Sequence, residues 1–251
     1  MIKVKNLSGS YGQEEVLHQL QAEFPVGKVN VIIGPNGCGK SSLLKSIIGL
    51  LPKQQGEIYF GEESLTKLTP KERAKRIAYL PQSKVSSKIT VFQMVLHGRF
   101  PHLSYPRRYT KRDNKIAQEA LETMGIENLA GKSLSELSGG TVQKVYLAMI
   151  LAQQTPVILM DEPTANLDVA HQKKVMEEAK LLAKEGKTVI MVLHDLTQVF
   201  SQADHLVIME RGRIRQMGSP EEIYHSDVIQ KVFGISMGRF QIGEEWKYYY
   251  C

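Results

Sequence analysis

Cysteine and tryptophan are scarce in this 251-residue chain, which holds two cysteines and one tryptophan. Cys38 and Cys251 are too few for a disulfide framework and lack the spacing of metal ligands, so we expect a reduced compartment. Long apolar runs are also lacking, and none approaches the roughly 18 residues that would span a bilayer. The first residues, M-I-K-V-K, do not begin an apolar signal core. We expect a cytoplasmic protein.

Internal repeats at solenoid periods and low-complexity linkers are absent too, which excludes repeat architectures. With 42% hydrophobic and 23% charged residues, the composition is that of an ordinary globular protein rather than a disordered or fibrous one. The length allows one large α/β domain or two small ones. The order of motifs along the chain has to decide between them.

The chain is basic, with a formal net charge of +6 and an isoelectric point near 9.1. Such a charge could favour nucleic acid, anionic lipid or nucleotide phosphates, and by itself it identifies no partner. We interpret the basic run R-R-Y-T-K-R at residues 107–112 as a solvated face, because charge runs usually are.

Apolar segments without alternation are the main structural signal. Residues 29–33 are a β-branched run that ends at a glycine-rich turn, and residues 41–50 after the turn are compatible with a helix. Residues 157–160 and 188–193 are likewise continuous apolar runs, as expected for strands buried on both faces of a parallel sheet.

Helical patterns lie between and before these last two strands. Residues 170–185 have the length of a crossover helix, with Gly186 as its stop, and strand-helix-strand units of this kind build doubly wound α/β folds. The region at about 91–154 contains few strand runs and several helical patterns, including residues 114–124 and 141–153. We interpret it as an inserted helical subdomain.

Residues 34–41, G-P-N-G-C-G-K-S, match the phosphate-binding pattern G-x-x-x-x-G-K-[ST] in the required strand-to-helix context. Backbone amides and the helix N-terminus offer positive potential to phosphates, Lys40 adds a mobile charge, and Ser41 should bind Mg²⁺. Cys38 is interpreted as a small loop residue rather than a nucleophile. The predicted nucleotide contacts are Gly34, Pro35, Asn36, Gly37, Cys38, Gly39, Lys40, Ser41 and Ser42.

Two adjacent carboxylates, Asp161 and Glu162, follow the predicted strand at 157–160. In a P-loop protein, a carboxylate at this place is suited to hold magnesium, which we assign to Asp161. Glu162 could then polarise the attacking water as a general base. The alternative is an acidic cap on the strand without a chemical role.

Residues 137–141, L-S-G-G-T, resemble the LSGGQ signature of ATP-binding-cassette (ABC) ATPases. Residues 163–168, P-T-A-N-L-D, resemble the D-loop of that family, and His194 resembles its switch histidine. Gln82 matches the Q-loop glutamine, and Tyr11 falls where the family places an aromatic ring against adenine. These motifs keep the family's order from about residue 4 to at least residue 223, so the chain is identified as a member of the family.

The resemblance implies an α/β fold: a P-loop NTPase (RecA-like) core with an N-terminal antiparallel β lobe and an inserted α-helical subdomain. The whole chain would be one ABC ATPase domain, with the core and β lobe at about 1–85 and 155–251 and the helical subdomain at about 86–154. ATP and Mg²⁺ are the implied cofactors. The implied catalytic residues are Glu162, His194 and Gln82, and the implied metal ligands are Ser41, Gln82 and Asp161.

The resemblance also implies a head-to-tail homodimer with ATP between one P-loop and the partner's signature. Ser138, Gly139 and Gly140 would contact the γ-phosphate across the interface, and Asp168 of the D-loop would belong to the same nucleotide site. Thr141 departs from the family pattern, in which glutamine is usual. We expect ATP sandwiching to survive this change and any effect to fall on coupling or basal rate.

Residues 91–102, with the core G-R-x-P-H at 98–102, resemble a segment in ATPases of iron-chelate (siderophore), haem and cobalamin importers. This implies a peripheral subunit on the cytoplasmic face of the cell membrane, bound to an integral-membrane permease dimer and served indirectly by a substrate-binding protein. Gln82 and residues 91–102 would face the permease. The alternatives are a metal-ion or other small-molecule importer, an exporter, an ABC protein acting on ribosomes or DNA, and a small-molecule kinase. We expect no nucleic-acid partner.

Overall fold

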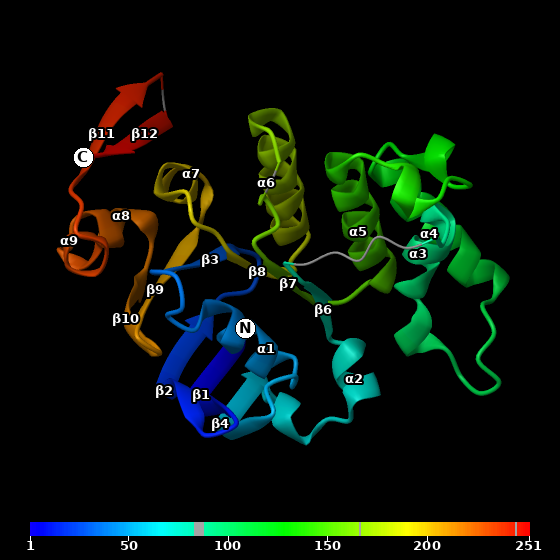
Figure 1. Cartoon of the computed structure of the whole chain (residues 1–251), viewed down its shortest axis with the longest axis horizontal. Helices are drawn as coiled ribbons and strands as arrows, with labels where there is room; N and C mark the ends of the chain where they lie inside the picture. Colours follow the sequence, from blue (N-terminus) through cyan, green and yellow to red (C-terminus); the bar gives the residue numbers. More distant parts are fainter. Residues whose placement is uncertain (83–87, 166, 244) are drawn as a thin grey trace.

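The computed structural model describes residues 1–82, 88–165, 167–243 and 245–251. A six-stranded sheet runs through the middle of the molecule in the order β10-β9-β3-β8-β7-β6 (Figure 1). Its neighbouring strands pair in parallel except for β10, which is antiparallel to β9. The strands are β3 Val29–Ile33, β6 Ile77–Leu80, β7 Val157–Asp161, β8 Thr188–Val192, β9 His205–Glu210 and β10 Arg213–Gly218.

Both faces of this sheet are covered, and alternate side chains of one strand enter different cores. Val31 and Ile158 point into a cluster shared with helices α5, α6 and α7, whereas Ile32 and Leu159 point into a cluster shared with α1 and the antiparallel lobe. Every residue of β3, β7 and β8 is buried, so the prediction of two-sided strands from unbroken apolar runs is confirmed. The covering helices are α1 Lys40–Ile47, α6 Val169–Lys184 and α7 Leu196–Gln202.

An antiparallel sheet of order β2-β1-β4-β5 lies beside the α1 face, at the bottom of Figure 1. Its strands are β1 Ile2–Tyr11, β2 Glu14–Phe24, β4 Lys53–Phe60 and β5 Glu63–Ser64. Leu17, Phe24 and Ile58 of this lobe share one hydrophobic cluster with Leu43 of α1. The lobe therefore holds the first helix after the glycine-rich turn against the central sheet.

The helical subdomain has a hydrophobic core of its own. That cluster contains only residues between Val91 and Ala152, with partly buried neighbours from Ile89 onward, which lie inside the predicted limits of 86–154. Its main helices are α3 Val91–His97, α4 Lys111–Thr123 and α5 Gly139–Gln153. Figure 1 shows this subdomain at the end of the molecule opposite the C-terminus.

The G-R-x-P-H segment contributes mainly to the interior of the subdomain. Arg99 is 6% exposed, and its guanidinium donates to Asp113 Oδ1 at 3.1 Å and to the carbonyl of Ala152 at 2.8 Å. A Cβ on Gly98 would lie 2.2 Å from the carbonyl oxygen of Met149. The expectation that the whole segment faces a partner is therefore wrong for Arg99, which is occupied in holding α3, α4 and α5 together.

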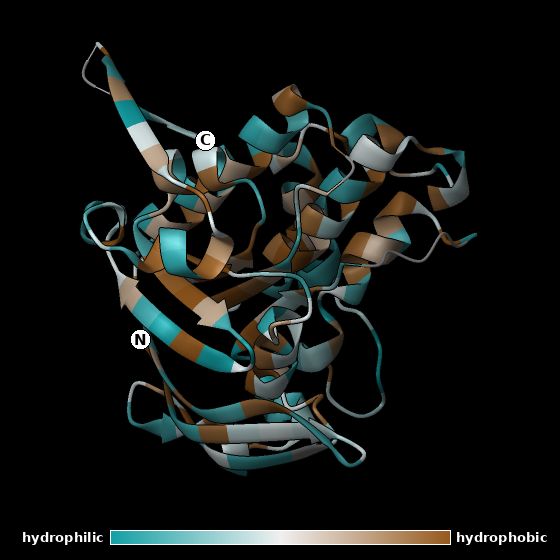
Figure 2. Cartoon of the chain, turned by 60° about the vertical axis from the view of Figure 1, so that its left-hand side comes forward, coloured by the Kyte–Doolittle hydropathy of each residue, from teal (hydrophilic) through white to brown (hydrophobic). Residues whose placement is uncertain are grey.

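The aromatic C-terminal segment forms a hairpin of β11 Met237–Ile242 and β12 Glu245–Tyr250 rather than one terminal strand. Tyr248 packs against Phe200 of α7, with ring centroids 5.3 Å apart, and Arg239 pairs with Glu221. Figure 2 shows the hairpin projecting from the body of the molecule. We predicted that this tail packs against the rest of the chain. Its inner side does so, whereas Tyr249 and Tyr250 are exposed.

Shorter elements complete the chain. They are α2 Pro70–Ala74, α8 Pro220–Tyr224, α9 Val228–Phe233 and the 3₁₀ turns η1 Leu65–Lys67, η2 Phe100–His102, η3 Glu127–Leu129 and η4 Leu134–Glu136. Within the described ranges, the helices are all too short or too polar to traverse a lipid bilayer.

The buried Arg99–Asp113 ion pair yields a stability prediction. Asp113→Ala should lower the free energy of unfolding by about 3 to 5 kcal/mol, because the Arg99 guanidinium stays buried without its carboxylate. Glu119→Ala is the control, since it removes only an exposed pair with Lys115 and should cost less than about 1 kcal/mol. Equal losses in urea unfolding of the two variants would contradict the prediction.

The same pair predicts a pH dependence. Burial acts to raise the pKa of Asp113, but hydrogen bonds from Thr110 and Arg99 outweigh it and hold the pKa below the ordinary 3.8. A lowered folded-state pKa adds stability above the unfolded pKa, and this stability is lost as the pH falls through the folded value. The difference in free energy of unfolding between wild type and Asp113→Ala should therefore be smaller well below pH 4 than at neutral pH. Urea unfolding at the two pH values measures it.

Candidate functional site

The glycine-rich loop leaves the end of β3 and enters α1, as predicted. Gly34 lies so close to its neighbours that a Cβ there would be 2.2 Å from the carbonyl oxygen of Met209 and 2.7 Å from Cys38 Sγ. Gly39 caps α1 in the left-handed region, with a φ of 102°. Glycine is needed at both places, at Gly34 for space and at Gly39 for conformation.

Lys40 brings a charge into this loop. Lys40 is only 6% exposed, and its Nζ donates to the carbonyl oxygens of Gly34 and Pro35 at 2.8 and 3.0 Å. Cys38 is buried in the loop, and burial raises the pKa of its thiol despite the nearby Lys40 charge. A raised pKa agrees with the interpretation of Cys38 as a packing residue rather than a nucleophile.

Ser41 and Asp161 meet at the mouth of the loop, although 120 residues separate them. Ser41 Oγ donates to Asp161 Oδ1 at 2.9 Å, and Tyr79 Oη donates to Asp161 Oδ2 at 3.3 Å. Burial raises the pKa of Asp161, the neighbouring Glu162 charge raises it further, and the hydrogen bond from Ser41 acts against both. A buried carboxylate beside a hydroxyl is an oxygen donor set that fits Mg²⁺.

These two oxygens would not complete a metal site without other ligands. Among the described residues, no group of three or more His, Cys, Asp or Glu side chains is arranged to hold a metal. Mg²⁺ commonly keeps several waters and takes phosphate oxygens from a nucleotide. The donor set at Ser41 and Asp161 therefore fits a cation that arrives with phosphate.

The three predicted catalytic residues meet at the carboxylate of Glu162. Its backbone has a φ of 50°, and its amide donates to the carbonyl of Val192 in β8 at 3.2 Å. Gln82 Nε2 donates to Glu162 Oε2 at 2.7 Å, and His194 Nε2 lies 2.6 Å from Glu162 Oε1. The structure thus brings Gln82 and His194 to the two oxygens of one carboxylate, next to Asp161.

Tyr11 lies beside the first helix that follows the loop. Lys45 Nζ sits 5.8 Å from the centre of the Tyr11 ring, and Lys45 is one turn beyond Ser41 on α1. The ring is 38% exposed, so a flat ligand could reach its face. The partly buried Ser42 occupies the first turn of the same helix.

The signature and D-loop residues form a second group. Ser138 caps α5, and its Oγ lies 2.9 Å from Thr141 Oγ1. Asp168 caps α6 and accepts from the backbone of His171 at 2.8 Å. Within the described part of the chain, no hydrogen bond joins this group to the P-loop. Residue 166 of the predicted D-loop lies outside the described residues.

Two site residues were missed by sequence reasoning. The Tyr79 hydroxyl reaches Asp161 from the adjacent strand β6, and no local pattern indicates this pairing. The imidazole of His171 bonds Asp168 through Nδ1 at 2.8 Å, and a Cβ added at Gly140 would lie 3.5 Å from its ring. Its position three residues after a helix-capping aspartate was a signal that could have been read.

Comparison with known proteins connects this geometry to a family. The sequence model of the family described as "ABC transporter" matches residues 17–165, which is more than half of the chain. The chain belongs to the ABC transporter family. It is therefore an ATPase of the ABC type.

Curated ABC relatives match nearly the full length. The chain is 38% identical to the ferric enterobactin transport ATP-binding protein of Escherichia coli, covering 93% of this chain and 87% of that protein. It is 36% identical to the iron(3+)-hydroxamate import ATP-binding protein of Bacillus subtilis, covering 93% and 88%. A solved ABC transporter, inward-facing and assigned to the metal-chelate type, superposes with a TM-score of 0.85 at 27% identity, covering 100% and 96%.

The close approach at Gly34 predicts different results for two glycine substitutions in this ABC protein. Gly34→Ala should abolish nucleotide binding and lower the melting temperature, because the added methyl meets a backbone carbonyl that cannot move aside. Gly140→Ala should keep the fold, since its Cβ would make ordinary contact with His171 at 3.5 Å. Thermal unfolding and fluorescent-nucleotide binding would check both, and a stable, nucleotide-binding Gly34→Ala would refute the close packing.

Proposed function

We propose that this chain is the ATP-hydrolysing subunit of an ABC importer for an iron-siderophore, haem or cobalamin. The observation that carries the proposal is the convergence of Gln82, Glu162 and His194 beside the Ser41–Asp161 pair. The cargo class is supported by the names of relatives that match over nine-tenths of the chain, which transport or import iron chelates.

Nucleotide binding is assigned to the P-loop and the residues around it. Lys40 is held by two carbonyl oxygens, which compete weakly with a phosphate for a full positive charge. Ser41 and Asp161 would hold Mg²⁺, which neutralises phosphate charge when bound. Gln82 was also predicted as a metal ligand, and its side chain lies against Glu162 in this structure. Tyr11 would stack on adenine.

Water activation is assigned to Glu162. Its carboxylate is fixed by Gln82 on one oxygen and by His194 on the other, so it is oriented before any water arrives. The His194 side chain is 43% exposed, so it has room to turn. It would move between Glu162 and the γ-phosphate. A positioned base of this kind contributes roughly 10²- to 10⁴-fold to a rate.

We propose a homodimer because, within the described part of the chain, no hydrogen bond joins the signature and D-loop residues to the P-loop. The N-terminus of the 15-residue helix α5, with Ser138, Gly139 and Gly140, would offer amides and a hydroxyl to the γ-phosphate bound by the other subunit. Asp168 would approach the same interface from α6. The Thr141 hydroxyl hydrogen-bonds the Ser138 hydroxyl. The longer side chain of a glutamine at this position would not place a polar atom in the same way.

The permease dimer would bind near Gln82 and the exposed part of residues 91–102. Phe100 is 49% exposed, in contrast with its buried neighbour Arg99, and Arg107 stacks on its ring. Phe100 is therefore a large apolar side chain of that segment offered to a partner, next to the exposed polar residues Gln93 and His97. The subunit would lie peripherally on the cytoplasmic face of the membrane, and the substrate-binding protein would act through the permease.

The first test uses Glu162→Gln, which should retain ATP binding and lose roughly 10²- to 10⁴-fold in ATPase rate. Glu119→Gln, at an exposed helix position, is the matched control and should leave the rate unchanged. Mass spectrometry of what co-purifies with the trapped variant from detergent-solubilised membranes should identify a multi-helix permease. Recovery of ribosomal or DNA-repair proteins instead would overturn the import function and leave the ATPase intact.

Thr141 gives a second test. Thr141→Val removes one hydroxyl that bonds Ser138 in each subunit, a net interaction of about 0.5 to 1.5 kcal/mol at each of the two sites, so ATP-driven dimerisation should change by no more than about a hundredfold. The nucleotide dependence of dimer formation in the Glu162→Gln background, followed by size-exclusion chromatography with light scattering, measures this. Complete loss of the dimer would show that the hydroxyl pair is essential to the sandwich.

A further inference from the structure

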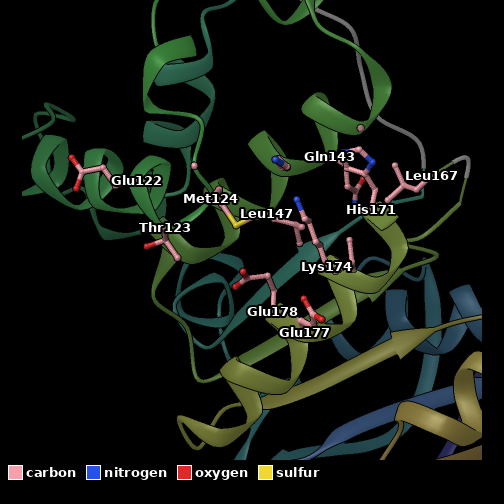
Figure 3. A pocket seen from close by; sticks show the side chains of 14 residues that line it. Glu122, Thr123, Met124, Gln143, Leu147, Leu167, His171, Lys174, Glu177 and Glu178 are labelled. Carbon is pink, nitrogen blue, oxygen red and sulfur yellow. The ribbon is translucent and has the colours of Figure 1, made fainter. Parts of the chain in front are cut away.

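A cavity of about 410 Å³ lies between the helical subdomain and the core, and the described residues that line it include none from the P-loop. Figure 3 shows its walls: Gln143 and Leu147 come from α5, and His171, Lys174 and Glu178 come from α6. The C-terminal end of α4 and the residues after it close a third side. The size lies at the lower end of small-molecule pockets, which hold roughly 300 to 1,000 Å³.

Gln143 is the most informative residue of this cavity. It is 1% exposed, and neither Oε1 nor Nε2 of its side chain has a hydrogen-bond partner in the described residues. Buried amides are nearly always paired, because an unpaired donor or acceptor loses its hydration without replacement. An amide with both atoms free calls for a ligand that offers one donor and one acceptor together.

Opposite charges stand unpaired on the facing helix. Lys174 and Glu178 are four residues apart on α6, a spacing at which helix residues usually pair, yet no ion pair joins them in the part of the chain described here. Lys173 and Glu177, one residue earlier in each case, do pair, at 3.8 Å. Burial raises the pKa of the Glu178 carboxyl, and the charges of Glu177 and Glu185 raise it further, so a cation beside it would be favoured.

The lining also has an apolar part, next to further polar residues that include Glu122, Lys144 and His171. Leu147 and Val175 are 6% and 4% exposed, and Met124 lies beside them on the third side. These side chains give the cavity an apolar patch beside its charged residues. A ligand that satisfies the lining therefore needs a positive group, a negative group and a small apolar part.

We propose that this cavity is a binding site for a small zwitterion with an apolar side chain, of which an aliphatic α-amino acid is the simplest example. Its ammonium group donates to Gln143 Oε1 and is balanced by Glu178. Its carboxylate accepts from Gln143 Nε2 and is balanced by Lys174. The aliphatic part lies against Leu147 and Val175.

The position of the cavity gives such binding a consequence. A ligand would bridge α5 and α6, and Gly140 of the signature is part of the same lining. Occupancy would hold the helical subdomain in one orientation against the core and so adjust the ATPase rate. This regulatory effect rests on the proposed function, whereas the binding itself does not.

Binding can be measured on the full chain without nucleotide. Isothermal titration calorimetry with L-leucine and L-methionine should give heat, whereas leucine amide, which lacks the carboxylate, and 4-methyl-2-oxopentanoate, which lacks the ammonium, should bind at least about tenfold more weakly. Because nucleotide is absent, failure of the import function would leave this result unchanged.

Three variants locate the site. Gln143→Met and Lys174→Met should each weaken leucine binding at least about tenfold, and Lys173→Met, at the neighbouring paired lysine, should not. Gln143→Met is expected to fold, since it replaces an unpaired amide with an apolar side chain of similar size, and its melting temperature checks this. The proposal is overturned if neither amino acid binds at millimolar concentration, if the two analogues bind equally well, or if Lys174→Met binds as wild type does.

Discussion

Parallel strands buried on both faces impose the constraint on which the rest of this structure depends. Such strands are mostly apolar, and the amide of Asn30 within β3 is taken up by backbone carbonyls, so the chain places its chemistry where each strand ends. The glycine-rich loop follows β3, Asp161 ends β7, and His194 comes just after β8. Because all three strands run the same way, these groups share one edge, and Ser41 can bond Asp161 across 120 residues of sequence. The apolar interior of the sheet therefore determines where the site lies.

The nucleotide loop and the buried strands could be predicted because each depends on local composition. The prediction for residues 29–33 coincides with β3, and residues 157–160 fall one residue short of β7. Helix starts were less accurate, since α4 begins at Lys111 rather than residue 114. A capping box between Thr110 and Asp113 extends it, and the T-x-x-D spacing was visible in the sequence.

The antiparallel lobe came only from the family resemblance, and the structure shows why periodicity missed it. The pairing of β1 with β2 shifts register after Val4, after Leu7 and after Gly9, so β1 has no steady two-residue alternation. The Tyr79 hydroxyl and the position of the His171 ring near Gly140 were missed for another reason. Both depend on which elements lie side by side, and neither follows from the spacing of residues within one element.

Because Arg99 is buried, similarity in the G-R-x-P-H segment gives information about how the helical subdomain is built rather than about the transported molecule. In this chain the arginine acts through the assembly of three helices, so a shared arginine would report a shared way of building the subdomain. They need not share a cargo. Classification of such ATPases by the full segment would therefore sort them by scaffold ancestry. A discriminating sequence signal for the transported molecule should instead be sought where the segment reaches the surface, at Gln93, His97 and Phe100, and in the membrane protein that meets it.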